Sequence, residues 1–442
     1  MKICLHCGAA NDNGAERCTV CDKTFLYQTD GAAMQNAVNT QNVPFMQDPM
    51  NMQSPAMAQN AWQPAAEPAP AVDPNAWKWD LSELCEIDRI HYGKNASYDM
   101  DADLGSIAER IHKGIRSKGL DAEPEMIRDI IAAMATSHIL IVKEAHGASS
   151  VTDGLIEAIA ESFGDMLGRA MAGDNWLQTL DMLTRVDPVN RRWIPSDVLR
   201  ALYGASYHKN AMATVQLRGV KLSELQSYFF ECLRSVQMPW DPQYITWKDQ
   251  IPNRPKRFSD SETMSGASNL RVSTGVWYWL VIADDAEFSI PRELYDYAAV
   301  VDLVGVVGAA EPMVEKPLPI SGRHFQSLIS RSKETSFPQE EYWKRFDLLN
   351  EYLTTTVGYT FKNLLWRRLE NYVSVFMACG GEVMDAMDHA IAAIIIPELC
   401  GYEREKLAGR GDELSILSSL EQILGEDHIS ASTDAIKKLG LI

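Results

Sequence analysis

The sequence predicts an α/β fold in which a parallel β-sheet core is followed by a C-terminal helical subdomain. Apolar runs without polar alternation, at residues 139–142 (ILIV) and 275–282 (GVWYWLVI), are typical of parallel strands buried on both faces. Strand-like and helix-like segments alternate over roughly 170 residues, as expected of a parallel sheet with crossover helices. From about residue 325 onward only helical periodicity remains.

The composition is that of a globular protein with about two or three domains. The chain has 442 residues, of which 46% are hydrophobic and 23% charged, and its formal net charge is −19. This charge argues against broad contact with nucleic acid or anionic membrane, although a local basic patch is compatible with it. No apolar run approaches the roughly 18 residues needed to cross a bilayer. The first residues lack the apolar core of a signal peptide, so we expect a cytoplasmic location.

Four cysteines near the N-terminus predict a zinc ribbon over residues 1–26. Two CxxC pairs, Cys4 with Cys7 and Cys18 with Cys21, have the spacing that lets four thiolates surround one tetrahedral Zn²⁺. Four protein ligands leave no open coordination position, so we expect one structural zinc per chain. A redox role for the two pairs is the alternative. The ribbon could contact protein or nucleic acid, and its near-neutral composition does not favour DNA.

Residues 27–76 are rich in Ala, Gln, Asn, Met and Pro and carry almost no charge. This composition predicts a disordered linker that tethers the ribbon to the rest of the chain. We expect the α/β domain with its leading helices over residues 77–320 and the helical subdomain over residues 321–442.

The apolar pattern predicts the individual elements in chain order. Between residues 176 and 193 the sequence is polar, and no strand is expected there. Helices are expected at residues 81–90, 107–115, 127–134, 155–163 and 198–203, from about residue 222, and within 291–298, and four more are expected in the C-terminal part. Strands are expected at residues 139–142, 214–217, 275–282 and 299–307.

Residues 144–151 lie between a strand and a helix, where a phosphate-binding loop would be found. A working loop has the pattern GxxxxGK[ST], whose lysine neutralises phosphate and whose hydroxyl binds Mg²⁺. Here Glu144 and Ser149 replace the outer glycines, Ser150 replaces the lysine, and only Gly147, at an optional position, fits. Glu144 would place a carboxylate beside the phosphates. Strand, loop and helix also occur in proteins that never bound nucleotide, so an ordinary structural unit is the alternative.

The end of the second predicted strand is also unsuited to nucleotide hydrolysis. An Asp-Glu pair would be needed there, one carboxylate to hold Mg²⁺ and the next to polarise the attacking water. Arg218 and Gly219 occupy these positions. Arg218 has the wrong charge for a metal ligand.

The ordered part of the chain resembles the AAA+ ATPases of the McrB-like group, within the MoxR-related branch. Several landmarks carry the resemblance in the family's order: IRSKGLDAEPEMIRDIIAAM before SHILIV, then VQLRGVKLSELQSYFFECL, VWYWLVIADDAEFSIPRELYDYAAVVDL, and IIIPELCG. Tyr228, Phe229 and Asp296 match family positions. The resemblance implies an AAA+-like core and, by analogy, a setting in a restriction or defence complex.

The departures from the family all fall on its chemistry. Besides Ser150, Arg218 and Gly219, the sensor-1 asparagine corresponds to Ile282 or Ala283 and a family arginine to Tyr297; a sensor-2 arginine would fall near Leu364, close to Lys362. Loss of all these positions with retention of the apolar frame predicts a pseudo-ATPase, with no catalytic or nucleotide-binding residues. The chain is therefore expected not to be an enzyme.

Other residues could form sites of their own. Asp284 and Asp285 follow a predicted strand, but an acidic pair there is usually a solvated loop or a helix cap. Lys362, Trp366, Arg367 and Arg368 form a basic and aromatic cluster that we interpret as a surface or subunit face. The aromatic run 277–279 is expected to be buried.

Three functions are compatible with the sequence. The first is a non-catalytic AAA+-like scaffold or ring subunit, whose tethered zinc ribbon recruits a partner such as an active ATPase or a nuclease. The second is an adaptor that binds nucleic acid through the ribbon. The third is a protein with residual nucleotide binding.

Overall fold

The computed structural model describes residues 2–3, 10–11, 77–164, 166–173, 176–208, 210–237, 244–247, 255–261, 267–273, 275–283, 290–308, 317–335, 340–400, 402, 404–408, 415–439 and 441. The chain divides into two compact units, Met1–Ala76 and Trp77–Ile442. In the first unit, β1 (Lys2–Ile3) pairs antiparallel with β2 (Ala10–Asn11). The four cysteines predicted to bind zinc, and the predicted linker, lie outside the described residues.

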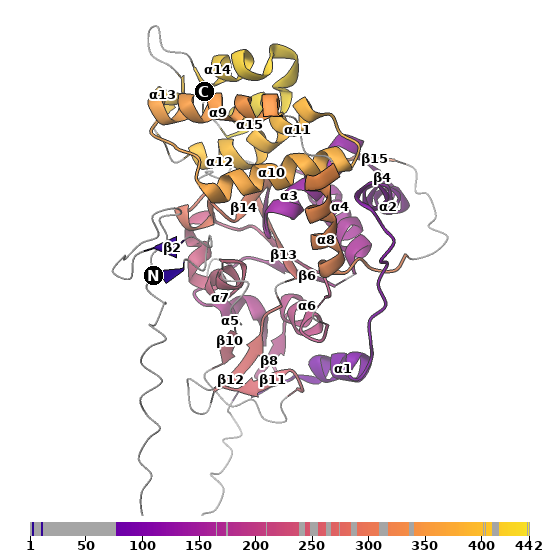
Figure 1. The fold of residues 1–442 in the computed structure, drawn as a ribbon. Coiled ribbons are helices and arrows are strands. Elements are labelled where there is room, and N and C mark those ends of the chain that lie inside the picture. Colours follow the sequence, from indigo (N-terminus) through magenta and orange to yellow (C-terminus); the bar gives the residue numbers. More distant parts are fainter. Residues whose placement is uncertain are drawn as a thin grey trace, which may run out of the picture. The chain divides into compact units, whose positions relative to one another are not determined.

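A five-stranded parallel sheet forms the centre of the second unit and confirms the predicted α/β class (Figure 1). The strands are adjacent in the order β14, β5, β13, β9, β6, and every pair in this sheet is parallel. Their bounds are β5 (Ile139–Glu144), β6 (Leu167–Met171), β9 (Ala213–Arg218), β13 (Val276–Ala283) and β14 (Ala298–Val301).

The middle strands are apolar because both of their faces are covered. Seven of the eight residues of β13 are buried, including Trp277, Tyr278 and Trp279, as the sequence predicted. The indole of Trp277 donates to the carbonyl of Met134, so its one polar atom is satisfied.

Helices cover this sheet and connect its strands. Those of the α/β part are α1 (Ser82–His91), α2 (Leu104–Ser117), α3 (Pro124–Thr136), α4 (Ser149–Phe163), α5 (Thr179–Leu183), α6 (Asp197–Ala205) and α7 (Leu225–Gln237), which follows the 3₁₀ turn η1 (Leu222–Glu224). α4 begins six residues before the predicted start at residue 155, with its first turn directly after the loop. α6 packs on β6 and β9, and α3 packs on β14.

The C-terminal part is helical, as predicted (Figure 1). Its elements are α8 (Gly322–Thr335), α9 (Glu340–Thr356), α10 (Asn363–Ala378), α11 (Val383–Ala390), the π-helical turn η3 (Ile391–Ile395), α12 (Ile396–Leu399), α13 (Arg404–Ala408), α14 (Ile416–Leu424), η4 (Glu426–His428) and α15 (Ser430–Lys438). α10 packs against α3 and α8, and η3 packs against β14. None of the described helices is long and apolar enough to cross a membrane.

Two predicted elements differ from the structure. Residues 291–298 hold only the 3₁₀ turn η2 (Arg292–Leu294), because the chain must enter β14 at Ala298. The predicted strand 299–307 is split, since its last part, β15 (Val306–Val307), leaves the sheet and pairs antiparallel with β4 (Leu120–Asp121).

Several strands were not predicted at all. The edge strand β6 has the sequence LGRAM, which contains no β-branched residue. No strand was expected in the polar region between residues 176 and 193, but a hairpin of β7 (Thr184–Asp187) and β8 (Arg192–Pro195) begins there. Strand β8 also pairs with β3 (Lys78–Trp79). A second small antiparallel sheet contains β10 (Tyr244–Trp247), β11 (Phe258–Asp260) and β12 (Ser268–Arg271).

Candidate functional site

The candidate site lies at the carboxyl edge of the central sheet, where parallel sheets commonly bind ligands. β5 ends at Glu144, the loop 145–148 follows, and α4 begins at Ser149. β9 ends at Arg218, and β13 lies between these two strands. Gly147 has a φ of +80°, which a glycine adopts without the strain that a side chain would introduce.

An ion pair joins the two strand ends across β13. Arg218 donates from Nη1 to Glu144 Oε2 and from Nη2 to Glu144 Oε1, both at 2.6 Å. Such a two-pronged contact is the strongest form of arginine–carboxylate pairing. The side chains of Arg218 and Glu144 are only 14% and 12% exposed, so water screens the contact weakly.

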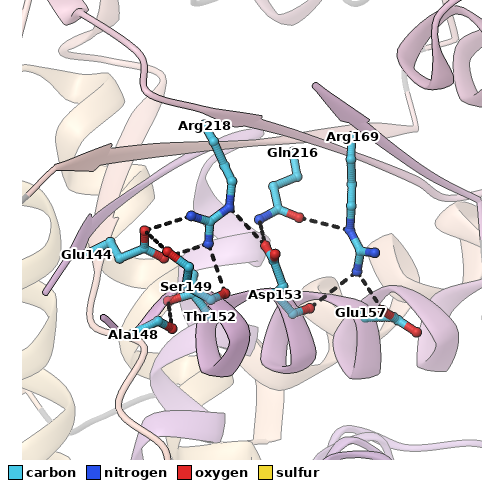
Figure 2. A network of polar contacts seen from close by, with 9 residues as sticks. All are labelled: Glu144, Ala148, Ser149, Thr152, Asp153, Glu157, Arg169, Gln216 and Arg218. Atoms are coloured by element: carbon cyan, nitrogen blue, oxygen red, sulfur yellow. Dashed lines mark hydrogen bonds and ion pairs between the residues drawn. The ribbon is translucent and has the colours of Figure 1, made fainter. Parts of the chain in front are cut away.

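The same guanidinium also binds the first turns of α4. Its Nε donates to Asp153 Oδ1 at 2.9 Å, and Nη2 donates to the carbonyl of Ser149 at 3.0 Å. The hydroxyl of Ser149 donates to Glu144 Oε2 at 3.1 Å. Figure 2 shows the Arg218 guanidinium between Glu144 and Asp153, above the start of the helix. The loop is therefore tied to both β5 and β9.

Further polar contacts continue this network along α4 (Figure 2). Gln216 donates to Asp153 Oδ1 at 2.6 Å, and Arg169 of β6 donates to Gln216 Oε1 at 3.2 Å and to Glu157 Oε2 at 2.6 Å. Glu157 also accepts from Lys118 at 2.8 Å. Anions on α4 thus alternate with cations from the sheet and from the end of α2. We use the name charge ladder for the set of side chains Glu144, Arg218, Asp153, Gln216, Arg169, Glu157 and Lys118.

Within the charge ladder, Glu144 and Arg218 hold each other in their ionised forms. Burial alone would raise the pKa of Glu144, but hydrogen bonds from Arg218 and Thr152 outweigh it and hold that pKa below its usual value. Burial would likewise lower the pKa of Arg218, and the contacts with Glu144 and Asp153 raise it instead. Both groups therefore stay charged over the ordinary pH range.

These residues do not fit a nucleotide and its metal ion. Phosphate needs uncommitted cations, and Mg²⁺ needs carboxylate or hydroxyl oxygens free to bind it. The guanidinium of Arg218 is already committed to Glu144, Asp153 and Ser149. Ser150 lies exposed in the first turn of α4. The arrangement is self-neutralised.

Gly219 has a conformational role. Its φ is +65°, and a Cβ there would lie 3.2 Å from the sulfur of Met171. Glycine lets the chain turn sharply after β9. From the sequence alone, Gly219 was interpreted only as the absence of an acidic residue at this position.

Sequence reasoning flagged Glu144 and Arg218 separately but missed that they are partners. It also missed Asp153, Glu157, Arg169 and Gln216 altogether. A signal existed, because Ser149, Asp153 and Glu157 recur at intervals of four and so share one face of α4. Their partners on β6 and β9 could not be inferred without the strand order.

The interpretation of the C-terminal basic cluster as a surface face is wrong for Arg368. Lys362 and Arg367 are exposed, but Arg368 lies on the face of α10 that packs inward and is 2% exposed. Its guanidinium lies 3.3 Å from Glu398 Oε1 and donates to main-chain carbonyls. Asp284 and Asp285 lie outside the described residues.

Across the described ranges, no group of three or more His, Cys, Asp or Glu side chains is placed to hold a metal ion. The predicted zinc ligands lie outside these ranges.

Comparison with known proteins gives similarity among solved structures. No protein-family model matches the chain, and no curated protein matches it. Among solved structures it is similar to the crystal structure of a protein from Cytophaga hutchinsonii, described as a candidate ATPase. The two have 9% sequence identity and a TM-score of 0.44, over 73% of this chain and 94% of the other.

Proposed function

We propose that this chain is a non-catalytic, AAA+-like subunit of the cytoplasm that serves as a scaffold or ring component. In this proposal the zinc ribbon at Cys4, Cys7, Cys18 and Cys21, with one structural Zn²⁺, is a tethered arm that recruits a partner. An active AAA+ ATPase or a nuclease, in a McrB-like restriction or defence complex, is the kind of partner that the resemblance implies.

The architecture supports the AAA+-like part of the proposal. Numbered in chain order, the five parallel strands lie in the order 5-1-4-3-2, and a helical part follows the sheet. A parallel sheet core followed by a helical part is what the resemblance to AAA+ proteins implies.

The two-pronged Arg218–Glu144 pair is the observation that carries the non-catalytic part. A triphosphate would have to separate this pair and would then meet the Glu144 carboxylate. Leaving one partner of this largely buried ion pair unpaired costs about 2–3 kcal/mol. Position 150 is a serine, so the lysine that could offset that cost is missing. The pair therefore takes the place that phosphate and metal would need.

Calorimetry with Mg-ATP and Mg-GTP tests the proposal. We expect no affinity in the micromolar range and no hydrolysis. Ser150→Lys alone should not restore hydrolysis, because Arg218 and Gly219 would leave metal and water unsupported. Saturable binding that Gly147→Asp abolishes would contradict the proposal. Gly358→Asp is the matched control, since that glycine also has a positive φ and open space around it.

Recruitment needs a separate experiment. A tagged full-length chain, expressed in its own cells, should recover an ATPase or a nuclease, and Cys7→Ser should reduce that recovery by releasing the zinc. Purified protein without one equivalent of zinc would contradict the ribbon. Recovery of nucleic acid alone would favour the adaptor instead.

A further inference from the structure

A cavity of about 330 Å³ lies at the amino edge of the central sheet, away from the charge ladder. Residues 94–98 form one wall, the end of α4 and residue Met166 form another, and His91 and His208 come from the ends of α1 and α6. α1 packs against α6 (Figure 1). Phe163, Met166 and Met212 supply apolar lining. The size suits a small organic molecule.

The polar lining of this cavity is one-sided in charge. It includes two imidazoles, the ammonium of Lys94 and the side chains of Asn95, Ser97 and Tyr98, and no carboxylate lies among the described lining residues. The whole chain has 60 acidic residues and a net charge of −19, so this is a local reversal of charge. Lys94 forms no ion pair with any described residue. Its charge is available to a ligand.

The two histidines form a pair that can gain protons. His91 Nδ1 lies 3.1 Å from His208 Nε2, so one ring donates to the other. This contact accommodates at most one charge, because two protonated rings would present N–H groups to each other. Burial, followed by the neighbouring His208 and Lys94, lowers the pKa of His91; burial and Arg257 lower that of His208. Without a ligand, both rings are therefore neutral at pH 7.

We propose that this cavity binds a small organic carboxylate, whose anionic end meets His91, His208 and Lys94, and whose short apolar chain lies against Phe163 and Met212. The bound anion compensates a proton on the imidazole pair, so binding takes up a proton. Affinity then rises as the pH falls toward 5.5.

Cations rather than anions dominate the surroundings of the imidazole pair. The ring of His91 stacks on Tyr207, whose hydroxyl donates to Asp88. The charged and titratable groups around the pair are Asp88, Tyr92 and Lys94 beside α1, Asp197, Arg200, Tyr203 and Tyr207 of α6 and its end, Lys256 and Arg257, and Tyr98. Of the carboxylates, Asp88 is taken up by Tyr203 and Tyr207 and Asp197 by Arg200.

Isothermal titration of the full-length protein with hexanoate tests the proposal. Hexanoate stays mostly ionised between pH 5.5 and 7.5, so a tenfold change in affinity over this range reports the protein's protons. We expect saturable binding whose dissociation constant falls about tenfold over this range, the effect of one charge-assisted hydrogen bond. Hexanol and hexylamine have the same chain without the negative charge and should bind at least about tenfold more weakly.

Variants decide whether this cavity is the site. Lys94→Gln should weaken hexanoate binding about threefold to tenfold at pH 6. His208→Asn should remove the pH dependence. His428→Asn, on an exposed histidine elsewhere, should change nothing. Lys94 is exposed, so its variant stays informative if the histidine variant fails to fold. Absence of saturable binding at pH 6, equal binding of hexylamine, or full binding by Lys94→Gln would each overturn the proposal.

Discussion

Two arginines, one at each edge of the same sheet, illustrate how differently a guanidinium can be used. Arg218 ends β9 at the carboxyl edge, and its partners are mainly side chains: Glu144 and Asp153. Arg368 projects from α10 to the amino edge, and half of its partners are main-chain carbonyls: Tyr295 at 2.7 Å and Ala298 at the first residue of β14. The others are the hydroxyl of Ser137 and the carboxyl of Glu398. The first joins the ends of two strands to the start of α4, whereas the second joins α10 to β14.

The arginine and its carboxylate partner are also less exposed to solvent at the amino edge than at the carboxyl edge. The side chain of Arg368 is 3% exposed and that of its partner Glu398 is 8% exposed, lower than at the carboxyl edge. Burial raises the pKa of Glu398 to about 7, although Arg368 beside it acts in the opposite direction. The carboxyl of Glu398 is therefore partly protonated at neutral pH. The main-chain carbonyls of Tyr295 and Ala298 then supply much of the stabilisation of the Arg368 charge. Removing either arginine exposes the difference between these environments.

The largest effect is expected from Arg368→Leu. It would leave the carbonyls of Tyr295 and Ala298 unpaired at the joint between the sheet and the helical part. We expect the free energy of unfolding to fall by about 3–5 kcal/mol, measured by urea titration. Arg367→Leu is the matched control: the same substitution one residue away, at an exposed position, should cost no more than about 0.5 kcal/mol. Equal losses in the free energy of unfolding for the two variants would mean that Arg368 does not link the helical part to the sheet.

A smaller effect is expected at the carboxyl edge, where water can reach a separated partner. Arg218→Met and Glu144→Gln should each cost about 2–3 kcal/mol, and the double variant should cost less than their sum. The coupling energy from this double-mutant cycle should be on the order of 1–3 kcal/mol. Arg185→Met, at a largely exposed arginine, serves as the control. Additive costs would show that the two side chains do not stabilise each other in solution.

The smallest effect concerns a third cation, one whose charge can be removed by pH. His389 of α11 lies 2.9 Å from Glu125 and 3.3 Å from Asp129, both on α3. Burial would lower its pKa, but Asp129 and Glu125 raise it to about 9. Because the folded pKa exceeds the unfolded value of about 6.5, the stabilisation is complete below pH 6.5 and is lost as the pH rises through 9.

The measurement is the free energy of unfolding between pH 7.5 and 10. The protein should lose on the order of 2 kcal/mol more than His389→Gln over this interval. Comparison with the variant cancels the titration of tyrosines and lysines elsewhere. Parallel profiles for the two proteins would mean that the imidazolium does not link α11 to α3.

The sequence was sufficient for the strands with apolar runs but not for the edge strand β6. β5 and β13 were predicted because burial on both faces requires continuous apolar runs. β6, with one side open, needs no such run and was missed. Likewise, Glu144 could be recognised as unsuited to phosphate and Arg218 as unsuited to a metal ion, but their pairing depends on β13 lying between their strands, which no local pattern reveals.

Arg368 is different, because its burial was predictable. Leu365, Leu369, Tyr372 and Phe376 recur at helical spacing and are all buried. Position 368 falls on the same stripe of α10, three residues after Leu365 and four before Tyr372. Treating it together with Arg367 as one basic cluster ignored the helical phase that separates two adjacent residues by about 100°.

The π-helical turn Ile391–Ile395 has a consequence for comparing this chain with its relatives. A π turn contains one residue more than an α-helical turn, so the segment behaves as a single-residue insertion. Pro397 cannot donate to the carbonyl four residues earlier, at Ala393, and its ring would collide with that carbonyl in a regular helix. Deleting one residue between 391 and 395 would turn everything downstream by about 100° and carry Glu398 away from Arg368. Homologues with a regular helix here should therefore align only with a gap, and should lack either the proline or the Arg368–Glu398 pair.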